Sequence, residues 1–206
     1  VEKDELGGTC LNRGCIPTKL FLHLSTKEKS LKRIQEKARE SILKLNSGMK
    51  YLLEAKKIAY INDEAEIISK NRILLKKTGN SVDFDILVLS LGSEPAIPKN
   101  FEKTEGMLTS DDILNLEEVP KRLAIIGGGY IGVEFACIFS MLGAEVTIVE
   151  KEKTILSSID ADAASLLTKS MEKKGVRILL GKSVDKIENS AVFINGGEEI
   201  PYDKVM

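Results

Sequence analysis

Apolar residues recur at steps of three and four between residues 31 and 52, and Lys, Arg and Glu occupy many of the positions between them. This spacing places the apolar side chains along one stripe of a helix. The stripe consists of Leu31, Ile34, Ala38, Ile42, Leu45, Met49 and Leu52. The pattern predicts an amphipathic helix whose apolar stripe faces a core.

From residue 57 to residue 90 the pattern changes to short apolar runs separated by turn formers, which is typical of strands. Strands are predicted at 58–61, 66–68, 72–75 and 85–89. The last run is continuously apolar, as expected for a strand buried on both faces. Three prolines then interrupt regular structure between 94 and 120. We interpret this stretch as a connection between domains, with one short helix capped by Ser110 or Asp111.

The region after residue 122 alternates strands and helices. An apolar strand at 123–126 leads into a Gly-rich turn, and the helix after it runs to Leu142 and stops at Gly143. A strand at 145–149, a helix at about 160–174 and a strand at 176–179 follow. This alternation predicts an α/β fold with a parallel sheet and right-handed crossovers.

The Gly-rich turn has the spacing of a dinucleotide-binding fingerprint. Gly127 permits a tight turn, Gly129 lets the backbone approach a pyrophosphate, and Gly132 lets the helix pack closely on the strand. The free N–H groups and the positive dipole end of the helix favour phosphate. Glu150, at the end of the second strand, is placed to accept both hydroxyls of an adenosine ribose and to repel a 2′-phosphate. NAD is therefore favoured over NADP, although Lys151 is a cation that could pair with such a phosphate.

Two cysteines, Cys10 and Cys15, stand at the start of a predicted helix with four residues between them. Such a pair can close a small ring, and the dipole of a helix activates a thiol near its start. A zinc site would need two further ligands, and the chain offers only Cys137 and His23. The spacing therefore predicts a redox pair and no metal site.

Composition excludes some function classes. The chain has 30 Lys and Arg against 31 Asp and Glu, so it has no excess of positive charge to neutralise nucleic-acid phosphates. It has no apolar run of the roughly 20 residues that span a bilayer, and its first residues lack the pattern of a signal peptide. Its three cysteines do not make a secreted disulfide framework. We expect a cytoplasmic protein that binds neither nucleic acid nor a membrane.

The phrase from Gly7 to Lys19 resembles the redox signature of the pyridine nucleotide-disulfide oxidoreductase family, and the phrase from Gly127 to Glu134 resembles the NAD fingerprint of that family. Leu11 and the Ile16-Pro17 step are most similar to the dihydrolipoamide dehydrogenase branch. The likeness extends over nearly the whole chain. It implies FAD and NAD as cofactors, a lipoamide-like dithiol or disulfide as substrate, and a homodimer.

The resemblance also implies two nucleotide-binding domains and a role for each matching residue. Residues 1–118 would be a partial FAD-binding domain that carries the redox helix, and residues 119–206 an NAD-binding domain with its last strand truncated. Cys10 would attack the substrate disulfide, Cys15 would lie against the flavin, and Lys19 near the flavin N5 would pair with Glu134 near the nicotinamide. Further implied FAD contacts are Glu2, Gly8, Thr9, Lys19, Ala65, Gly92 and Ser93. The implied NAD contacts are Gly127, Gly128, Gly129, Tyr130, Ile131, Gly132, Glu134, Glu150 and Val184.

The chain departs from the family pattern at both ends and at internal positions. Family members begin with a Gly-rich FAD-binding turn and end with an interface domain that supplies a His-Glu pair, and neither stands in these 206 residues. We therefore expect little turnover from the chain by itself. Leu91 stands where Thr is usual, Asp63 stands where Gly is usual, and the helical region after Lys19 is shorter. Cys137 is interpreted as a core side chain, and His23 as structural or surface-exposed.

Two alternatives remain. One is a related reductase that acts on glutathione-like disulfides or mercuric ion, but Glu150 argues against NADPH-linked members and no mercury-binding cysteine tail is evident. The other is a nucleotide-binding module without catalysis, which would leave Cys10 and Cys15 without a purpose.

Overall fold

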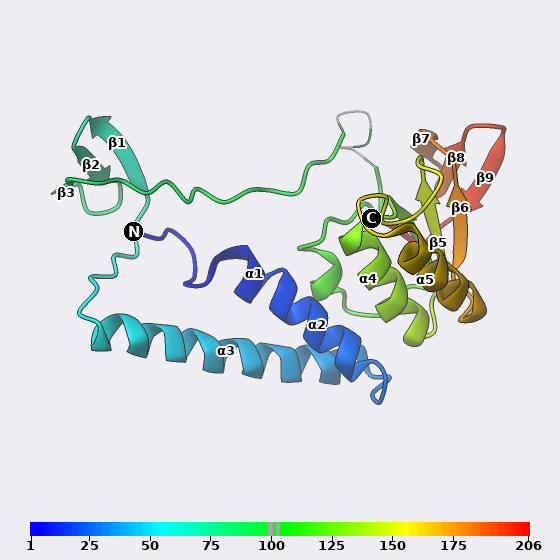
Figure 1. The fold of residues 1–206 in the computed structure, drawn as a ribbon, viewed down its shortest axis with the longest axis horizontal. Helices are drawn as coiled ribbons and strands as arrows, with labels where there is room; N and C mark the ends of the chain where they lie inside the picture. The colour runs from blue at the N-terminus through cyan, green and yellow to red at the C-terminus, as the bar shows by residue number, and fades with distance from the viewer. Residues whose placement is uncertain (99–100, 102–103) are drawn as a thin grey trace. The chain divides into compact units, whose positions relative to one another are not determined.

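A computed structural model describes residues 1–98, 101 and 104–206, shown in Figure 1. Contacts divide the chain into two compact units, one formed by 1–16 and 39–94 and the other by 17–38 and 95–206. This division follows packing within the described chain. The domain boundary between residues 118 and 119 stays a prediction.

The first unit combines helical segments with a small antiparallel sheet. Its helical parts are α1 (Gly8–Asn12), the start of α2 (Cys15–Leu24) and the later part of α3 (Leu31–Ala55). The sheet consists of β1 (Ala65–Ser69), β2 (Arg72–Leu75) and β3 (Ser81–Asp83) in that order. The strands predicted at 66–68 and 72–75 are confirmed. β3 was not predicted.

The helix α3 confirms the predicted periodicity, but only its early part faces a core as expected. Leu31, Ile34 and Ala38 are buried, whereas Leu45 and Leu52 are 46% and 57% exposed. The apolar stripe in the sequence is therefore longer than the part of α3 that the described residues bury.

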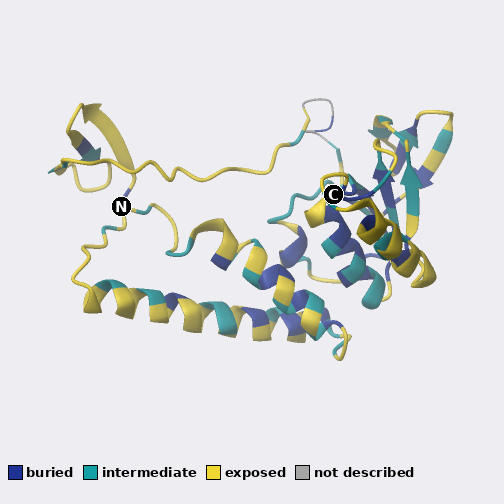
Figure 2. Ribbon diagram, viewed as in Figure 1, coloured by how far each residue is buried: buried dark blue, intermediate teal, exposed yellow. Residues whose placement is uncertain are grey.

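Two predicted strands are wrong. Residues 85–91 form no strand, and Figure 2 shows this segment exposed along its length, with Ile86 84% and Val88 79% exposed. A strand that is apolar on both faces needs neighbours, and none of the described strands pairs with this run. Residues 58–61 also form no strand, and the residue after them, Asn62, pairs with Glu2 as an isolated bridge and not as part of a sheet.

The second unit contains a four-stranded parallel sheet with the order β10-β4-β5-β6. The strands are β4 (Arg122–Ile126), β5 (Glu145–Glu150), β6 (Arg177–Leu180) and β10 (Lys204–Val205). Ile148 lies opposite both Ile125 and Ile178, which aligns the centres of three strands. The predicted α/β fold with a parallel, Rossmann-like sheet is confirmed.

Helices α4 (Tyr130–Met141) and α5 (Ala161–Lys173) connect these strands, as Figure 1 shows. The fully buried side chains of Phe135 and Phe139 on α4 join one core with Ile125 and Ile148 of the sheet. α4 ends as predicted, because Gly143 adopts a φ of 99°, which side chains other than hydrogen rarely allow. The early residues of α3 contribute to the same core.

The connection before the parallel sheet contains the 3-10 helix η2 (Ile113–Asn115). A short helix was predicted here, but its N-cap is Asp112 and not Ser110 or Asp111. The Asp112 carboxylate accepts hydrogen bonds from the backbone N–H and the hydroxyl of Thr109, and these bonds organise the turn before the helix. Residues 99, 100, 102 and 103 of the predicted 94–120 connection lie outside the described residues.

A second antiparallel sheet in this unit was not predicted. It consists of β7 (Val184–Glu188), β8 (Ala191–Ile194) and β9 (Glu198–Pro201). Asn189 and Ser190 join the first two strands with φ values of 51° and 56°, the positive values that a two-residue hairpin turn requires. Among the described residues, no helix has the length and apolar character needed to cross a membrane.

Candidate active site

The Gly-rich turn joins β4 to α4 and is tightly folded. Gly127 has a φ of 109°, and its N–H donates to the carbonyl of Val149 at 2.8 Å. A Cβ on Gly132 would lie 2.2 Å from the carbonyl oxygen of Gly127, so this residue packs directly on the turn. A Cβ on Gly129 would meet nothing within 4 Å. A side chain therefore has no room at Gly132, whereas the space around Gly129 is free.

Glu150 fixes the Gly-rich turn to the end of β5. Its Oε2 accepts a hydrogen bond from the Gly128 N–H at 2.5 Å, and its Oε1 accepts one from the Glu152 N–H at 2.8 Å. The carboxylate is thus held beside the turn by two backbone donors. The neighbouring Lys151 is exposed. This bridge from Glu150 to the turn was not part of the sequence-based expectation, which gave the carboxylate only a role toward the ribose.

The first turn of α4 is open to a ligand. Tyr130 and Ile131 are 58% and 55% exposed although both are large apolar residues. The Tyr130 hydroxyl lies 3.3 Å from the hydroxyl of Ser158. The first N–H groups of a helix have no partner within the helix and bind phosphate readily. Together with the space at Gly129, these residues fit the pyrophosphate of a dinucleotide.

Lys19 and Glu134 form an ion pair within the second unit, although 115 positions separate them in sequence. Lys19 Nζ lies 2.6 Å from Glu134 Oε1, and the two side chains are 58% and 26% exposed. Exposed ion pairs contribute little to stability, with a median of about 0–1 kcal/mol. Folding stability alone therefore gives little reason to keep this pair, and the structure brings together the two residues that the resemblance implies.

Val184, the remaining residue expected near NAD, is the first residue of β7. It lies opposite Ile194 in the second sheet and is half-buried. Its place in the adenine pocket stays a prediction.

The two cysteines of the predicted redox pair lie in two successive helices. Cys10 lies in α1 and Cys15 is the first residue of α2. Both side chains are exposed, and no disulfide joins any cysteines of the described chain. A Cβ on Gly14 would lie 3.1 Å from the Thr9 carbonyl oxygen and 3.5 Å from the Cys10 Cα, so the backbone just before Cys15 folds back onto α1. The absence of a side chain at Gly14 permits this close return.

Residues 7–15, which carry both cysteines and which we call the redox loop, are held by two asparagines that sequence reasoning did not single out. Asn12 lies between the cysteines, and its side-chain N–H group donates to the carbonyls of Leu6 at 2.9 Å and Gly8 at 3.0 Å. Asn46 on α3 donates to Asn12 Oδ1 at 2.8 Å. The position of Asn12 inside the cysteine motif was a usable signal. Asn46 gave none, because it lies 34 residues away beside an apolar stripe.

Apart from Lys19, the residues expected to contact FAD lie in the first unit. Glu2 Oε1 accepts a hydrogen bond from the Asp4 N–H at 2.9 Å, and its backbone bridges to Asn62. Ala65 begins β1, and Gly92 and Ser93 lie in the exposed extended segment. No hydrogen bond of the described residues joins these three to Glu2. Their roles, and those of Gly8 and Thr9 in α1, stay predictions.

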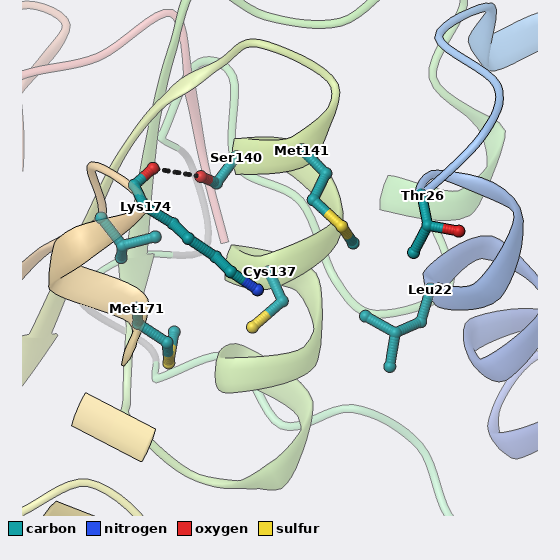
Figure 3. Close-up of a pocket in the computed structure, with 8 residues that line it drawn as sticks. Leu22, Thr26, Cys137, Ser140, Met141, Met171 and Lys174 are labelled. Carbon is teal, nitrogen blue, oxygen red and sulfur yellow. Dashed lines mark hydrogen bonds between the residues drawn. The ribbon is translucent and has the colours of Figure 1, made fainter. Parts of the chain in front are cut away.

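A small cavity lies in the second unit among α2, α4 and α5, and Figure 3 shows its walls. Its volume is about 190 Å³. It is lined by Leu22, Thr26, Cys137, Ser140, Met141, Met171, Lys174 and Val176. Cys137, expected as a core side chain, is only half-buried at this wall, and burial raises the pKa of its thiol.

The described residues contain no cluster of His, Cys, Asp or Glu that could hold a metal ion, and His23 is exposed on α2.

Comparisons with known proteins identify the family of this chain. The family model described as pyridine nucleotide-disulphide oxidoreductase matches residues 1–206. A dihydrolipoyl dehydrogenase of Mycoplasma genitalium is 34% identical over 233 residues, which cover 100% of this chain and 50% of that protein. A dihydrolipoyl dehydrogenase of Staphylococcus aureus is 33% identical over 211 residues, which cover 92% of this chain and 45% of that protein.

A solved structure is similar as well. The Cu(II) complex of the HOCl-induced flavoprotein disulfide reductase RclA from Escherichia coli has a TM-score of 0.85 and 28% identity, covering 99% of this chain and 48% of that one. The chain spans about half the length of the curated relatives it matches. With a family model that matches its full length and relatives above 30% identity, the chain belongs to the pyridine nucleotide-disulphide oxidoreductase family.

Proposed function

We propose that this protein is a flavin-dependent disulfide oxidoreductase that passes electrons between NAD and a dithiol or disulfide of the dihydrolipoamide class through Cys10 and Cys15. The observation that carries the proposal is the Lys19–Glu134 ion pair. Lys19 follows Cys15 by one turn of α2, and Glu134 stands in α4 just after the Gly-rich turn. The pair thus connects an element of the redox motif with an element of the nucleotide motif.

The residues of the chain have separate tasks in this reaction. Bound nicotinamide and flavin would supply the hydride and electron-transfer chemistry. Cys10 attacks the substrate disulfide as a thiolate, a mixed disulfide forms, and Cys15 then displaces the second substrate thiol as the Cys10–Cys15 bond closes. The exposure of both cysteines supports this exchange. Glu134 holds the Lys19 ammonium in place.

NAD is the proposed nucleotide because of Glu150. Its carboxylate is held beside the turn by the N–H groups of Gly128 and Glu152, and a fixed negative charge there disfavours a 2′-phosphate. The turn from Gly127 to Gly132 and the first residues of α4 would hold the pyrophosphate. The names of the curated relatives support a dihydrolipoamide substrate. A homodimer and a cytoplasmic location stay predictions, as does low turnover of the 206 residues by themselves.

The test uses the protein expressed from its complete reading frame, with NADH-dependent lipoamide reduction as the assay. Cys10→Ser and Cys15→Ser are expected to abolish lipoamide reduction, whereas the control Cys137→Ser retains it. NADH is expected to be used in preference to NADPH, and Glu150→Ala to reduce that preference. Full activity of either redox-cysteine variant, or a preference for NADPH, would contradict the proposal. Thiol titration before and after mild reduction separates the enzyme from a non-catalytic module, which has no reversible pair.

A further inference from the structure

Asn46 is a buried polar residue on the exposed later part of α3. The residue is 9% exposed, while its helix neighbours Leu43 and Leu45 are 58% and 46% exposed. In this part of α3 an amide side chain is therefore buried, while the apolar side chains beside it in sequence are exposed. Its side-chain N–H group donates to Asn12 Oδ1, and Asn12 lies between the two cysteines of the redox motif.

The orientation of both amides follows from the hydrogen-bond network. The Asn12 Nδ2 group faces the backbone carbonyls of Glu5, Leu6 and Gly8 at 3.5, 2.9 and 3.0 Å. Carbonyl oxygens only accept hydrogen bonds, so Asn12 must present its N–H group to them and its Oδ1 to Asn46. Asn46 must then present its own N–H group, which leaves its Oδ1 on the other side.

That remaining oxygen is buried and has no hydrogen-bond partner in the described chain. Burying an acceptor without a partner is costly, and such an atom in a native structure calls for an explanation. An apolar side chain of similar volume, such as Leu, would avoid this cost. Folding stability alone therefore does not account for Asn46.

The redox loop depends on these side-chain bonds because its own helix is weak. α1 has five residues, and its N-cap, Gly7, supplies no side-chain hydrogen bond. Helices of this length have little stability by themselves. Asn12 ties the last residue of α1 back to the chain that enters it, and Asn46 ties Asn12 to α3, a helix of 25 residues. Cys10 lies in α1, the helix that these hydrogen bonds connect to α3.

We propose that Asn46 is a positioning residue for the redox pair. Through Asn12 it fixes α1, and so it sets how readily the thiols of Cys10 and Cys15 convert to a disulfide. When the S–S bond forms, the two thiols lose two electrons and two protons, which a disulfide of the surrounding buffer accepts. The inference rests on the proposed redox function of this pair.

The experiment measures the dithiol–disulfide equilibrium of Cys10 and Cys15 in the protein from the complete reading frame, held in mixtures of reduced and oxidised dithiothreitol. Alkylation followed by mass spectrometry gives the fraction of each form. Asn46→Leu removes both polar atoms, and Asn46→Asp keeps the size but its carboxylate cannot donate to Asn12. The control is Ser47→Ala at the next position, whose exposed hydroxyl donates only within its own helix.

Both Asn46 variants are expected to shift the equilibrium constant by about fivefold, the change that corresponds to one neutral hydrogen bond. Ser47→Ala is expected to leave it unchanged, and the urea midpoint of Asn46→Leu is expected to stay near that of the wild type. An unchanged equilibrium in the Asn46 variants, or loss of folding in both, overturns the inference. If the wild-type protein itself shows no reversible pair, the proposed function fails instead, so the two failures are distinguishable.

Discussion

Replacing Gly132 and Gly129 by Ala separates the two tasks of the Gly-rich turn. In Gly132→Ala the new Cβ would lie 2.2 Å from the Gly127 carbonyl oxygen and 3.1 Å from the Ile125 Cγ2. The first of these atoms is backbone, so the clash cannot be relieved by a side-chain rotation. Helix α4 must move away from β4, and the core behind it must open.

The size of the effect follows from two opposing contributions. Overpacking a well-packed site costs about 1–3 kcal/mol, and a contact this short against backbone belongs at the upper end. Ala is favoured over Gly in a helix by about 1 kcal/mol, which offsets part of the cost. Gly132→Ala is therefore expected to lower the free energy of unfolding by about 2 kcal/mol.

Gly129→Ala is expected to behave in the opposite way. Its φ of −75° suits any residue, and a Cβ there meets nothing within 4 Å. The free energy of unfolding should stay within about 0.5 kcal/mol of the wild type. The methyl group would nevertheless occupy the space proposed for the pyrophosphate. NADH affinity is expected to fall at least about tenfold, which is about 1.4 kcal/mol of binding free energy.

The assay pairs urea unfolding, followed by far-UV circular dichroism, with NADH binding followed by its fluorescence. Gly48→Ala is the matched control, because Gly48 lies in α3 and a Cβ there meets nothing within 4 Å. It should change neither NADH binding nor, beyond a small gain, stability. Equal destabilisation by Gly129→Ala and Gly132→Ala would refute the reasoning, as would undiminished NADH binding by Gly129→Ala.

Two further predictions concern ionisable groups. Burial acts to raise the pKa of Asp63, but hydrogen bonds from the N–H groups of Lys77 and Glu64 and from Thr78 lower it below the usual value. The Asp63 carboxylate therefore stabilises the folded state fully above the unfolded-state pKa of about 3.9, and this stabilisation is lost as pH falls through the folded-state pKa. The difference in urea midpoint between wild type and Asp63→Asn should shrink below about pH 4. A difference that stays constant with pH would contradict this. Because burial raises the pKa of the Cys137 thiol, its alkylation by iodoacetamide should accelerate only above the pH range of an ordinary thiol. Peptide-resolved mass spectrometry measures that profile, and an ordinary thiol profile would show the prediction to be wrong.

The nucleotide-binding half of the fold was predictable because its signals are local in sequence. A buried strand, a turn that requires glycine and a helix stopped by Gly143 are each signalled within a few residues of sequence. β4 and β5 lie within one residue of the expected bounds, and α4 ends one residue before the expected Leu142. The parallel sheet then follows from the alternation of these elements. Family membership rested on the same local phrases and is confirmed by the comparisons.

The other strands depend on partners that a local pattern does not reveal. Residues 85–89 have the composition of a buried strand, but no described strand pairs with them. The hairpin of β7 and β8 was missed for a different reason. Its turn residues, Asn189 and Ser190, both adopt positive φ values, whereas the familiar hairpin signals place Gly in such a turn.

The nucleotide turn and the redox loop are held by different means, and this difference explains which residues sequence reasoning found. The nucleotide turn is fixed by the Glu150 carboxylate and by backbone packing such as that of Gly132 on Gly127, and the packing requirement appears as glycines in the motif itself. The redox loop is fixed by side-chain amides, and the partner of Asn12 stands 34 residues away on α3. No fixed sequence spacing relates such an amide to the cysteine motif, so a local pattern does not identify it. Residues that position the cysteines are therefore to be sought among buried polar side chains such as Asn46, outside the motif that contains the cysteines.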